Sequence, residues 1–247
     1  MSPNTATIHH RQHGSLLAGP EKKLLIWIAG RLPRRVTSDQ LSLLGLGAML
    51  AAGLAFWAAS FDAAWLLVVI AALAVNWLGD SLDGTLARVR NQQRPHYGYY
   101  VDHVLDVAGA AFLFGGMALS SLMSTAVGLG LLAAYLMVSS ESYLATHARG
   151  VFKLSFLRIG PTELRLLLAG GALRLMVEPT VHLFGREWLL LDLGGVAAVV
   201  GLLAAFATAA LRNTAALYRE EPPPRPVAHE HATGAVTAPS RLPVQGR

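Results

Sequence analysis

The chain has 247 residues, of which 53% are hydrophobic and only 14% are charged. Ordinary soluble domains carry about 25% charged residues, so this composition indicates a membrane protein. Cysteine is absent, which excludes disulfides, thiolate metal sites and cysteine nucleophiles. The net charge of +5 predicts basic cytoplasmic loops that face anionic lipid, and no nucleic-acid partner is expected.

The first 19 residues are polar and mixed, and they include His9, His10 and His13. A metal role for these histidines is one alternative, but nothing nearby supports a packed site, so a disordered leader is expected. The segment also lacks the pattern of a secretory signal. These features predict a cytoplasmic N-terminus.

Residues 20–35 are too short and too charged to span a membrane. Their apolar residues share one face and basic residues stand at both ends, which is typical of an interfacial juxtamembrane helix. A plain basic flank to the first span is the alternative interpretation.

Six apolar segments follow, each long enough to cross a bilayer. They cover residues 41–59, 63–82, 99–119, 123–143, 164–183 and 189–211. The sequence therefore predicts an all-α integral membrane fold with six transmembrane helices, within a catalytic domain of residues 36–219. The tail, residues 220–247, is rich in proline and polar residues and is expected to be disordered.

The loops between the six segments alternate in charge. Basic residues gather before the first segment, in residues 88–97, in residues 147–165 and after the sixth segment, whereas the other loops carry little positive charge. The positive-inside rule then places both termini in the cytoplasm. Arg174 lies inside the fifth segment, where it is expected to snorkel or to pair with an acid such as Glu178.

Four aspartates interrupt the second and third apolar segments: Asp80, Asp83, Asp102 and Asp106. A charge at membrane depth costs at least a few kcal/mol, so such residues usually serve function. Residues three or four apart share a helix face, so each pair of aspartates points one way. Close carboxylates require neutralising cations, and an all-oxygen ligand set suits Mg²⁺ or Mn²⁺. A site for two divalent ions could stabilise charge on a transferring phosphoryl group.

Small and basic residues accompany the aspartates. Gly84 and Ala87 continue the stripe of the first pair and leave room for a bulky ligand, and Gly98 gives similar clearance one turn before Asp102. Arg88 supplies a positive fork that is suited to phosphate. Polar contacts between helices, without chemistry, are the alternative, but packing alone gives no reason for these offsets.

Together these residues form the pattern D-x2-D-G-x2-A-R-x9-G-x3-D-x3-D between Asp80 and Asp106, which resembles the signature of the CDP-alcohol phosphatidyltransferase family. The resemblance implies a six-helix membrane enzyme with a two-metal centre. Such an enzyme moves a substituted phosphoryl group from a CDP-linked donor to an alcohol and releases CMP. The resemblance also implies metal ligands at Asp80, Asp83 and Asp102, and a general base at Asp106 that could also be a ligand. It implies a CDP site that includes Gly84, Ala87, Arg88 and Gly98.

Other site residues are less sharply indicated. Asp39 and Ser42 stand where many family members carry a Pro-Asn-x-x-Thr entry that borders the nucleotide, although the same stretch also reads as a helix start capped by Ser38 or Thr37. Arg94 either contacts a donor phosphate or is only one of the basic loop residues that set the membrane topology. The family resemblance further suggests an acceptor site that contains Arg149, Lys153 and Arg158, and a plain basic loop is the alternative.

The favoured interpretation is a phospholipid-biosynthetic transferase of a bacterial inner (cytoplasmic) membrane, with its active site on the cytoplasmic side. It would transfer a phosphatidyl group from CDP-diacylglycerol to an alcohol. Head-group transfer from a CDP-amino alcohol to a lipid alcohol is the alternative, and His103 after Asp102 resembles a pair in choline and ethanolamine phosphotransferases.

Two alternatives come from other functional classes. One is a transporter or metal channel, but the sequence shows no inverted repeats or interrupted helices that would support it. The other is an inactive scaffold that retains the motif. The acceptor alcohol, the choice between Mg²⁺ and Mn²⁺, and the oligomeric state, with a homodimer among the options, stay open.

Overall fold

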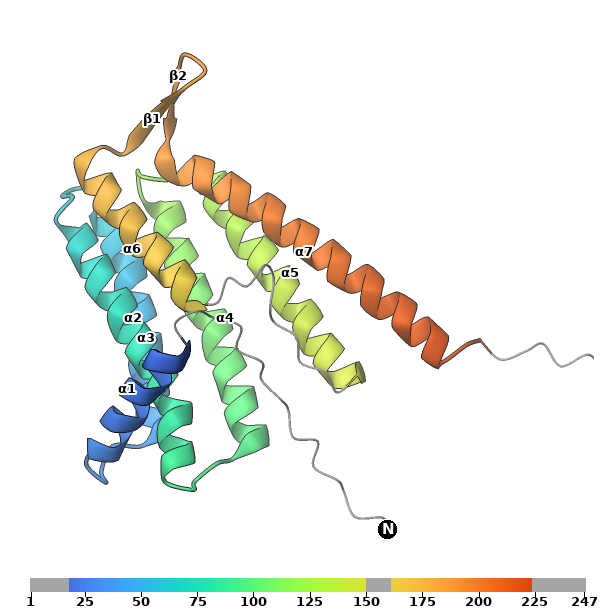
Figure 1. Ribbon diagram of the computed structural model, residues 1–247. Coiled ribbons are helices and arrows are strands. Elements are labelled where there is room, and N and C mark those ends of the chain that lie inside the picture. The colour runs from blue at the N-terminus through green and yellow to red at the C-terminus, as the bar shows by residue number, and fades with distance from the viewer. Residues whose placement is uncertain (1–17, 150–160, 224–247) are drawn as a thin grey trace, which may run out of the picture.

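The computed structural model describes residues 18–149 and 161–223. This part of the chain forms seven helices and one two-stranded hairpin (Figure 1). The helices are α1 (Ala18–Arg31), α2 (Ser38–Ala58), α3 (Trp65–Val89), α4 (Pro95–Leu119), α5 (Thr125–Arg149), α6 (Pro161–Val177) and α7 (Leu190–Glu220). The strands β1 (Thr180–Leu183) and β2 (Arg186–Leu189) join α6 to α7. The described residues are mostly helical, in agreement with the predicted all-α fold except for this hairpin.

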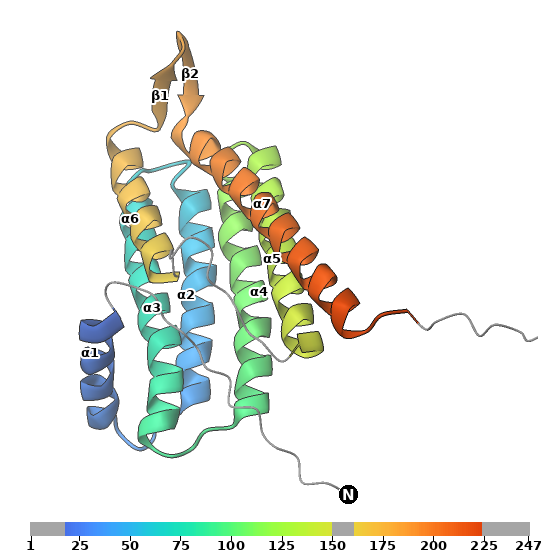
Figure 2. The ribbon, with the colours of Figure 1, turned by 45° about the vertical axis from the view of Figure 1, so that its right-hand side comes forward.

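Helix α2 lies at the centre of the bundle and packs against both α3 and α4. Helices α1 and α6 cover α3, while α5 packs on α4 and α7 packs on α5. Figure 2 shows α2 to α5 running side by side, with α7 inclined along α5. The main core is made of apolar side chains from the central helices, including Phe56, Leu66, Val69, Leu113 and Met117.

Five helices, α2, α3, α4, α5 and α7, are long and apolar enough to cross a membrane. They agree with the expected integral membrane protein. Helix α6 has 17 residues, which corresponds to about 25 Å, whereas the hydrocarbon core of a bilayer is about 30 Å thick. The sixth span therefore stays a prediction, and so does the interfacial position of α1. The predicted leader and tail fall largely outside the described residues.

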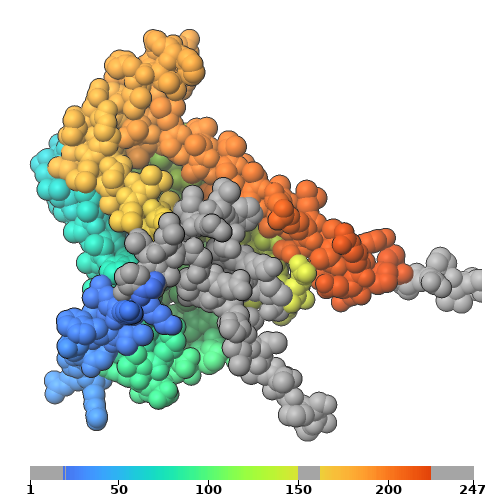
Figure 3. Space-filling view, viewed as in Figure 1, coloured from blue at the N-terminus to red at the C-terminus, as the bar shows by residue number. Residues whose placement is uncertain are grey.

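The prediction that the fifth apolar segment is helical through residue 183 is wrong. Helix α6 ends at Val177, and β1 pairs with β2 as an antiparallel hairpin. Pro179 stands two residues after the helix end, a place where proline prevents helix continuation. Phe184 and Gly185 form the turn with φ angles of 51° and 73°, as two-residue hairpin turns require. The hairpin projects beyond the ends of the helices (Figure 3).

The start of α2 is fixed by a capping box. The Thr37 side chain accepts a hydrogen bond from the Gln40 backbone N–H at 3.2 Å, and the Gln40 side chain accepts one from the Thr37 N–H at 3.0 Å. This arrangement satisfies two of the donors that a helix start leaves unpaired. The interpretation of this stretch as a capped helix start is therefore confirmed.

The chain between α1 and α2 is tied to the end of α3. Arg90 donates hydrogen bonds to the backbone carbonyls of Leu32, Pro33 and Val36. Charge-assisted bonds of this kind are stronger than neutral ones. Arg90, which lies in a loop that the sequence marks only as basic, therefore ties the connection between α1 and α2 to the end of α3.

Two glycines let α2 and α4 approach closely. A Cβ atom on Gly116 would lie 2.0 Å from the carbonyl oxygen of Gly53, and one on Gly53 would lie 2.1 Å from that of Phe112. No side chain fits at these separations, so the small residues set the helix crossing.

Gly116→Ala should lower the stability of the fold by about 3 kcal/mol, the upper end of the range for overpacking. The new methyl group meets backbone atoms, which cannot move aside like a flexible side chain. Thermal unfolding in detergent measures the effect as a lower Tm. Gly115→Ala is the matched control, because a Cβ there meets nothing within 4 Å. Equal Tm values for the two variants would contradict the close crossing.

Candidate metal centre

Three aspartates meet between α3 and α4. Asp80 on α3 and Asp102 and Asp106 on α4 each offer a carboxylate oxygen, and these atoms lie within 4.8 Å of one another. Asp80 lies toward the end of α3 and the other two toward the start of α4, so the helix connection brings them to the same level. Asp80 and Asp102 are partly buried, whereas Asp106 is exposed. The cluster thus has a closed side and an open side.

The geometry and the chemistry of this cluster fit a hard divalent cation. Oxygen ligands bind Mg²⁺ or Ca²⁺ at roughly 2.0–2.6 Å, so two ligands of one ion lie at most about 5 Å apart. The three aspartate oxygens satisfy that limit. Carboxylates are also the donors that Mg²⁺ and Mn²⁺ prefer.

Asp83, the fourth predicted ligand, does not belong to this group of three. One of its carboxylate oxygens accepts a hydrogen bond from Ser42 Oγ at 2.5 Å, and the other accepts one from the Gly84 backbone N–H. Its backbone carbonyl accepts a bond from the Ser38 hydroxyl. In the structure Asp83 therefore connects α3 to the start of α2, and its role as a metal ligand stays a prediction.

An arginine that the sequence analysis did not single out reaches the cluster from α6. Arg165 Nη2 lies 2.8 Å from Asp80 Oδ2, and Arg165 Nε donates to Asn76 Oδ1 at 2.8 Å. Asn76 stands four residues before Asp80, so both share one face of α3. Asn76 is a polar residue in an apolar segment and shares a helix face with Asp80, so the sequence alone could have indicated that the site extends one turn further along α3.

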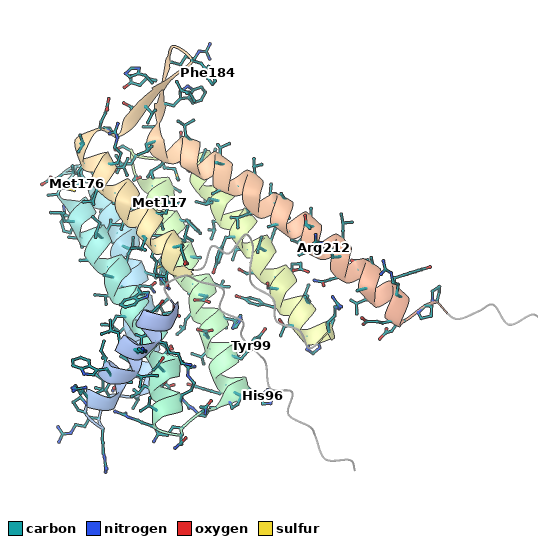
Figure 4. All side chains as sticks on the ribbon, viewed as in Figure 1. His96, Tyr99, Met117, Met176, Phe184 and Arg212 are labelled. Carbon is teal, nitrogen blue, oxygen red and sulfur yellow. The ribbon has the colours of Figure 1, made fainter. Side chains whose placement is uncertain are left out.

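An aromatic group lies on the α4 and α5 side of the aspartates. The His103 ring lies 4.1 Å from the Tyr99 ring and 4.6 Å from the Tyr143 ring, measured between centroids. His103 Nδ1 is 3.8 Å from Asp102 Oδ2 and 2.7 Å from the Tyr99 carbonyl oxygen. These contacts limit the rotation of His103 beside Asp102. Figure 4 labels Tyr99 and His96 near the start of α4.

Three of the predicted donor-binding residues line one pocket. A cavity of about 450 Å³ is bordered by residues of α2, α3 and the loop after α3, among them Asp39, Ala87 and Arg94. Arg94 forms an ion pair with Asp39, and its guanidinium lies 3.9 Å from the centre of the Tyr97 ring. The hydrogen bond with Asp39 raises the pKa of Arg94, so this side chain stays positive at any physiological pH.

The other predicted donor residues lie nearby but outside that pocket. Arg88 donates to Thr85 Oγ1 at 3.0 Å and borders a second cavity of about 240 Å³, which Lys22 of α1 also lines. A Cβ on Gly84 would lie 3.4 Å from Arg88 Nη1, while one on Gly98 would meet nothing within 4 Å. The space around Gly98 therefore agrees with the expected clearance.

The predicted acceptor residues do not gather at the cluster in the described part of the chain. Arg149 donates to Asn213 Oδ1 at 2.7 Å and lies 3.6 Å from Glu220, and Asn213 in turn donates to Glu141 at 2.6 Å. These bonds join α5 to α7. Lys153 and Arg158 lie outside the described residues.

The predicted pair of Arg174 and Glu178 is confirmed, with 2.8 Å between Arg174 Nη2 and Glu178 Oε2.

A comparison with known protein families gives a match. The model of the CDP-alcohol phosphatidyltransferase family matches residues 39–209, which is more than half of the chain. The matched region holds all four aspartates and Arg165. No curated protein gives a significant match.

Proposed function

We propose, because the chain belongs to the CDP-alcohol phosphatidyltransferase family, that it transfers a phosphatidyl group from CDP-diacylglycerol to the hydroxyl of an alcohol and releases CMP. Family membership supports the coarser activity, which is enzymatic transfer of a phosphoryl group from a CDP-alcohol. The observation that carries the proposal is the convergence of Asp80, Asp102 and Asp106.

The aspartates have different proposed roles. Asp80 and Asp102, with Asp83 as a further ligand, would hold divalent cations. Bound Mg²⁺ or Mn²⁺ would neutralise charge on the donor diphosphate and on the phosphorus under attack. Asp106 would accept the proton of the acceptor hydroxyl, and its exposure on the open side of the cluster leaves room for that alcohol.

The donor would lie along the ends of α2 and α3. The cavity bordered by Asp39, Ala87 and Arg94 is large enough for part of a nucleotide. Arg94 would have to exchange its carboxylate partner Asp39 for a donor phosphate, which is a reasonable exchange because both are oxyanions that accept from a guanidinium. Arg88 would meet the donor from the α1 side.

The site is proposed to face the cytoplasm, because the loops on its side of the bundle are the basic ones. Membrane-impermeant maleimide should label Gln92→Cys only from the cytoplasmic side and Ser121→Cys only from the opposite side. Both positions are exposed. Ser121 is chosen in place of the neighbouring Met123, because Met123 is buried. The chain has no cysteine of its own, so each variant carries one thiol. The reverse labelling pattern would overturn the orientation.

The reaction is tested by CMP release from purified protein with Mg²⁺ or Mn²⁺. CDP-diacylglycerol is offered with serine, glycerol phosphate or an inositol compound, and CDP-choline or CDP-ethanolamine is offered with diacylglycerol. Release of CMP only in the first set supports the proposal. Release only in the second set would establish head-group transfer, which is the second candidate because the pair Asp102 and His103 resembles one in choline and ethanolamine phosphotransferases. No release in either set would favour a transporter or an inactive scaffold.

A further inference from the structure

Arg165 uses one edge of its guanidinium to contact two residues of α3. Nε donates to Asn76 Oδ1 and Nη2 donates to Asp80 Oδ2, both at 2.8 Å. These two nitrogens lie in one rigid plane, so two simultaneous bonds fix the orientation of the group. The Arg165 side chain is only 18% exposed. An ion pair that is largely shielded from water is less weakened by solvent than a surface pair.

Asn76 is itself held in place from the other side. Its side chain is buried, with 8% exposure, and Nδ2 donates to the Gly45 carbonyl oxygen of α2 at 3.0 Å. That bond directs the amide oxygen toward Arg165. Helix α2 lies close at this point, since a Cβ on Gly79 would lie 2.7 Å from the Leu41 carbonyl oxygen. A chain of hydrogen bonds therefore runs from the α2 backbone through Asn76 and Arg165 to Asp80.

This series of hydrogen bonds fixes one oxygen of Asp80. A carboxylate has two oxygens that accept independently, so engagement of Oδ2 by Arg165 leaves Oδ1 to ligate a cation. We propose that Arg165 is a positioning residue of the metal centre, which holds the Asp80 carboxylate in the rotation that ligation requires. The inference rests on the metal centre proposed above. Groups that orient a metal ligand in this way typically change metal affinity 10- to 100-fold when they are replaced.

The positive charge of Arg165 has two opposite effects at the cluster. It offsets the mutual repulsion of three neighbouring carboxylates, and it also repels an incoming cation. Removal of the charge would change both effects together with the orientation. A decisive substitution must therefore keep the charge and remove only the planar fork.

Arg165→Lys meets this requirement, because an ammonium on a shorter stem lacks the two coplanar donors that span Asn76 and Asp80. Mn²⁺ affinity, measured by loss of the free-ion EPR signal without any substrate, should fall 10- to 100-fold. Asn76→Ala should weaken Mn²⁺ binding in the same direction, although it leaves every charge in place. Arg174→Lys is the matched control, because Arg174 lies on the same helix and, among the described residues, pairs with Glu178 one turn away. Its Mn²⁺ affinity should equal that of the wild type.

The outcomes separate this inference from the proposed function. If the wild type binds no Mn²⁺, the metal centre and the role of Arg165 both fail. If the wild type binds Mn²⁺ and folded Arg165→Lys and Asn76→Ala bind it within twofold as well, Arg165 is only a tether between α6 and α3. If the KM of the acceptor rises while Mn²⁺ affinity stays constant, Arg165 contacts substrate and the positioning role is wrong.

Discussion

Asp106→Asn should reduce turnover by at least about 10²-fold, which is the lower end of the rate enhancement that a general base supplies. The amide has nearly the shape of the carboxylate but cannot take up the proton of an acceptor hydroxyl. Asp106 is the exposed member of the cluster, so its replacement leaves the partly buried carboxylates Asp80 and Asp102 in place. Donor affinity should therefore change little, whereas CMP release under saturating donor and acceptor should fall.

Calorimetric titration of the donor distinguishes a base from a ligand. Asp83→Asn, at a predicted ligand, should impair donor and metal binding together. A matched control is Asp62→Asn, because Asp62 lies in the loop before α3 and accepts a hydrogen bond from the Ala64 N–H at 2.9 Å, which an amide oxygen can also do. If Asp106→Asn lost donor affinity as severely as Asp83→Asn, Asp106 would be better described as a fourth ligand.

Asp80→Asn should lower activity by about 10³-fold or more, since metal ions supply several kcal/mol of charge stabilisation and 1.4 kcal/mol corresponds to a factor of ten. The substitution removes one of the three converging carboxylates and also leaves the Arg165 guanidinium without its carboxylate partner. CMP release and the Mn²⁺ EPR titration should therefore both respond.

The fold of Asp80→Asn should persist, because Asn76 and the α2 contacts around Gly45 remain. Circular dichroism verifies that the helices are intact, and Asp62→Asn again serves as the control. Full activity of Asp80→Asn at ordinary metal concentration would show that the cluster is not the metal centre.

The long apolar segments of the chain predicted most helices, because a helix that crosses a bilayer needs a long, uninterrupted apolar run. This prediction failed between residues 178 and 183, where the sequence mixes polar and apolar residues and the backbone changes to a strand. Pro179 carried the relevant information, since proline cannot continue a helix, and Thr180 and Val181 are β-branched residues that favour strands. Hydropathy alone does not distinguish a strand from a helix over so few residues.

The aspartate cluster could be predicted because its members lie within two helical segments, where spacing defines a common face. The partners of those aspartates could not. Ser42 meets Asp83 and Arg165 meets Asp80 across sequence separations of 41 and 85 residues. Such contacts depend on how helices pack, which the spacing within one helix does not encode. Arg165 also resembled an ordinary basic loop residue because it follows a positively charged connection.

The hairpin of β1 and β2 is a place where sequence can be inserted far from the candidate metal centre. It lies between α6 and α7 at the opposite end of the bundle from the loop that joins α3 to α4 (Figure 1). Its turn is open, since a Cβ on Gly185 would meet nothing within 4 Å, and Phe184 is 95% exposed. Loop tips of this kind accept inserted sequence. An epitope or a small folded domain grafted between Phe184 and Gly185 would mark the distal surface of the protein for affinity capture or for imaging.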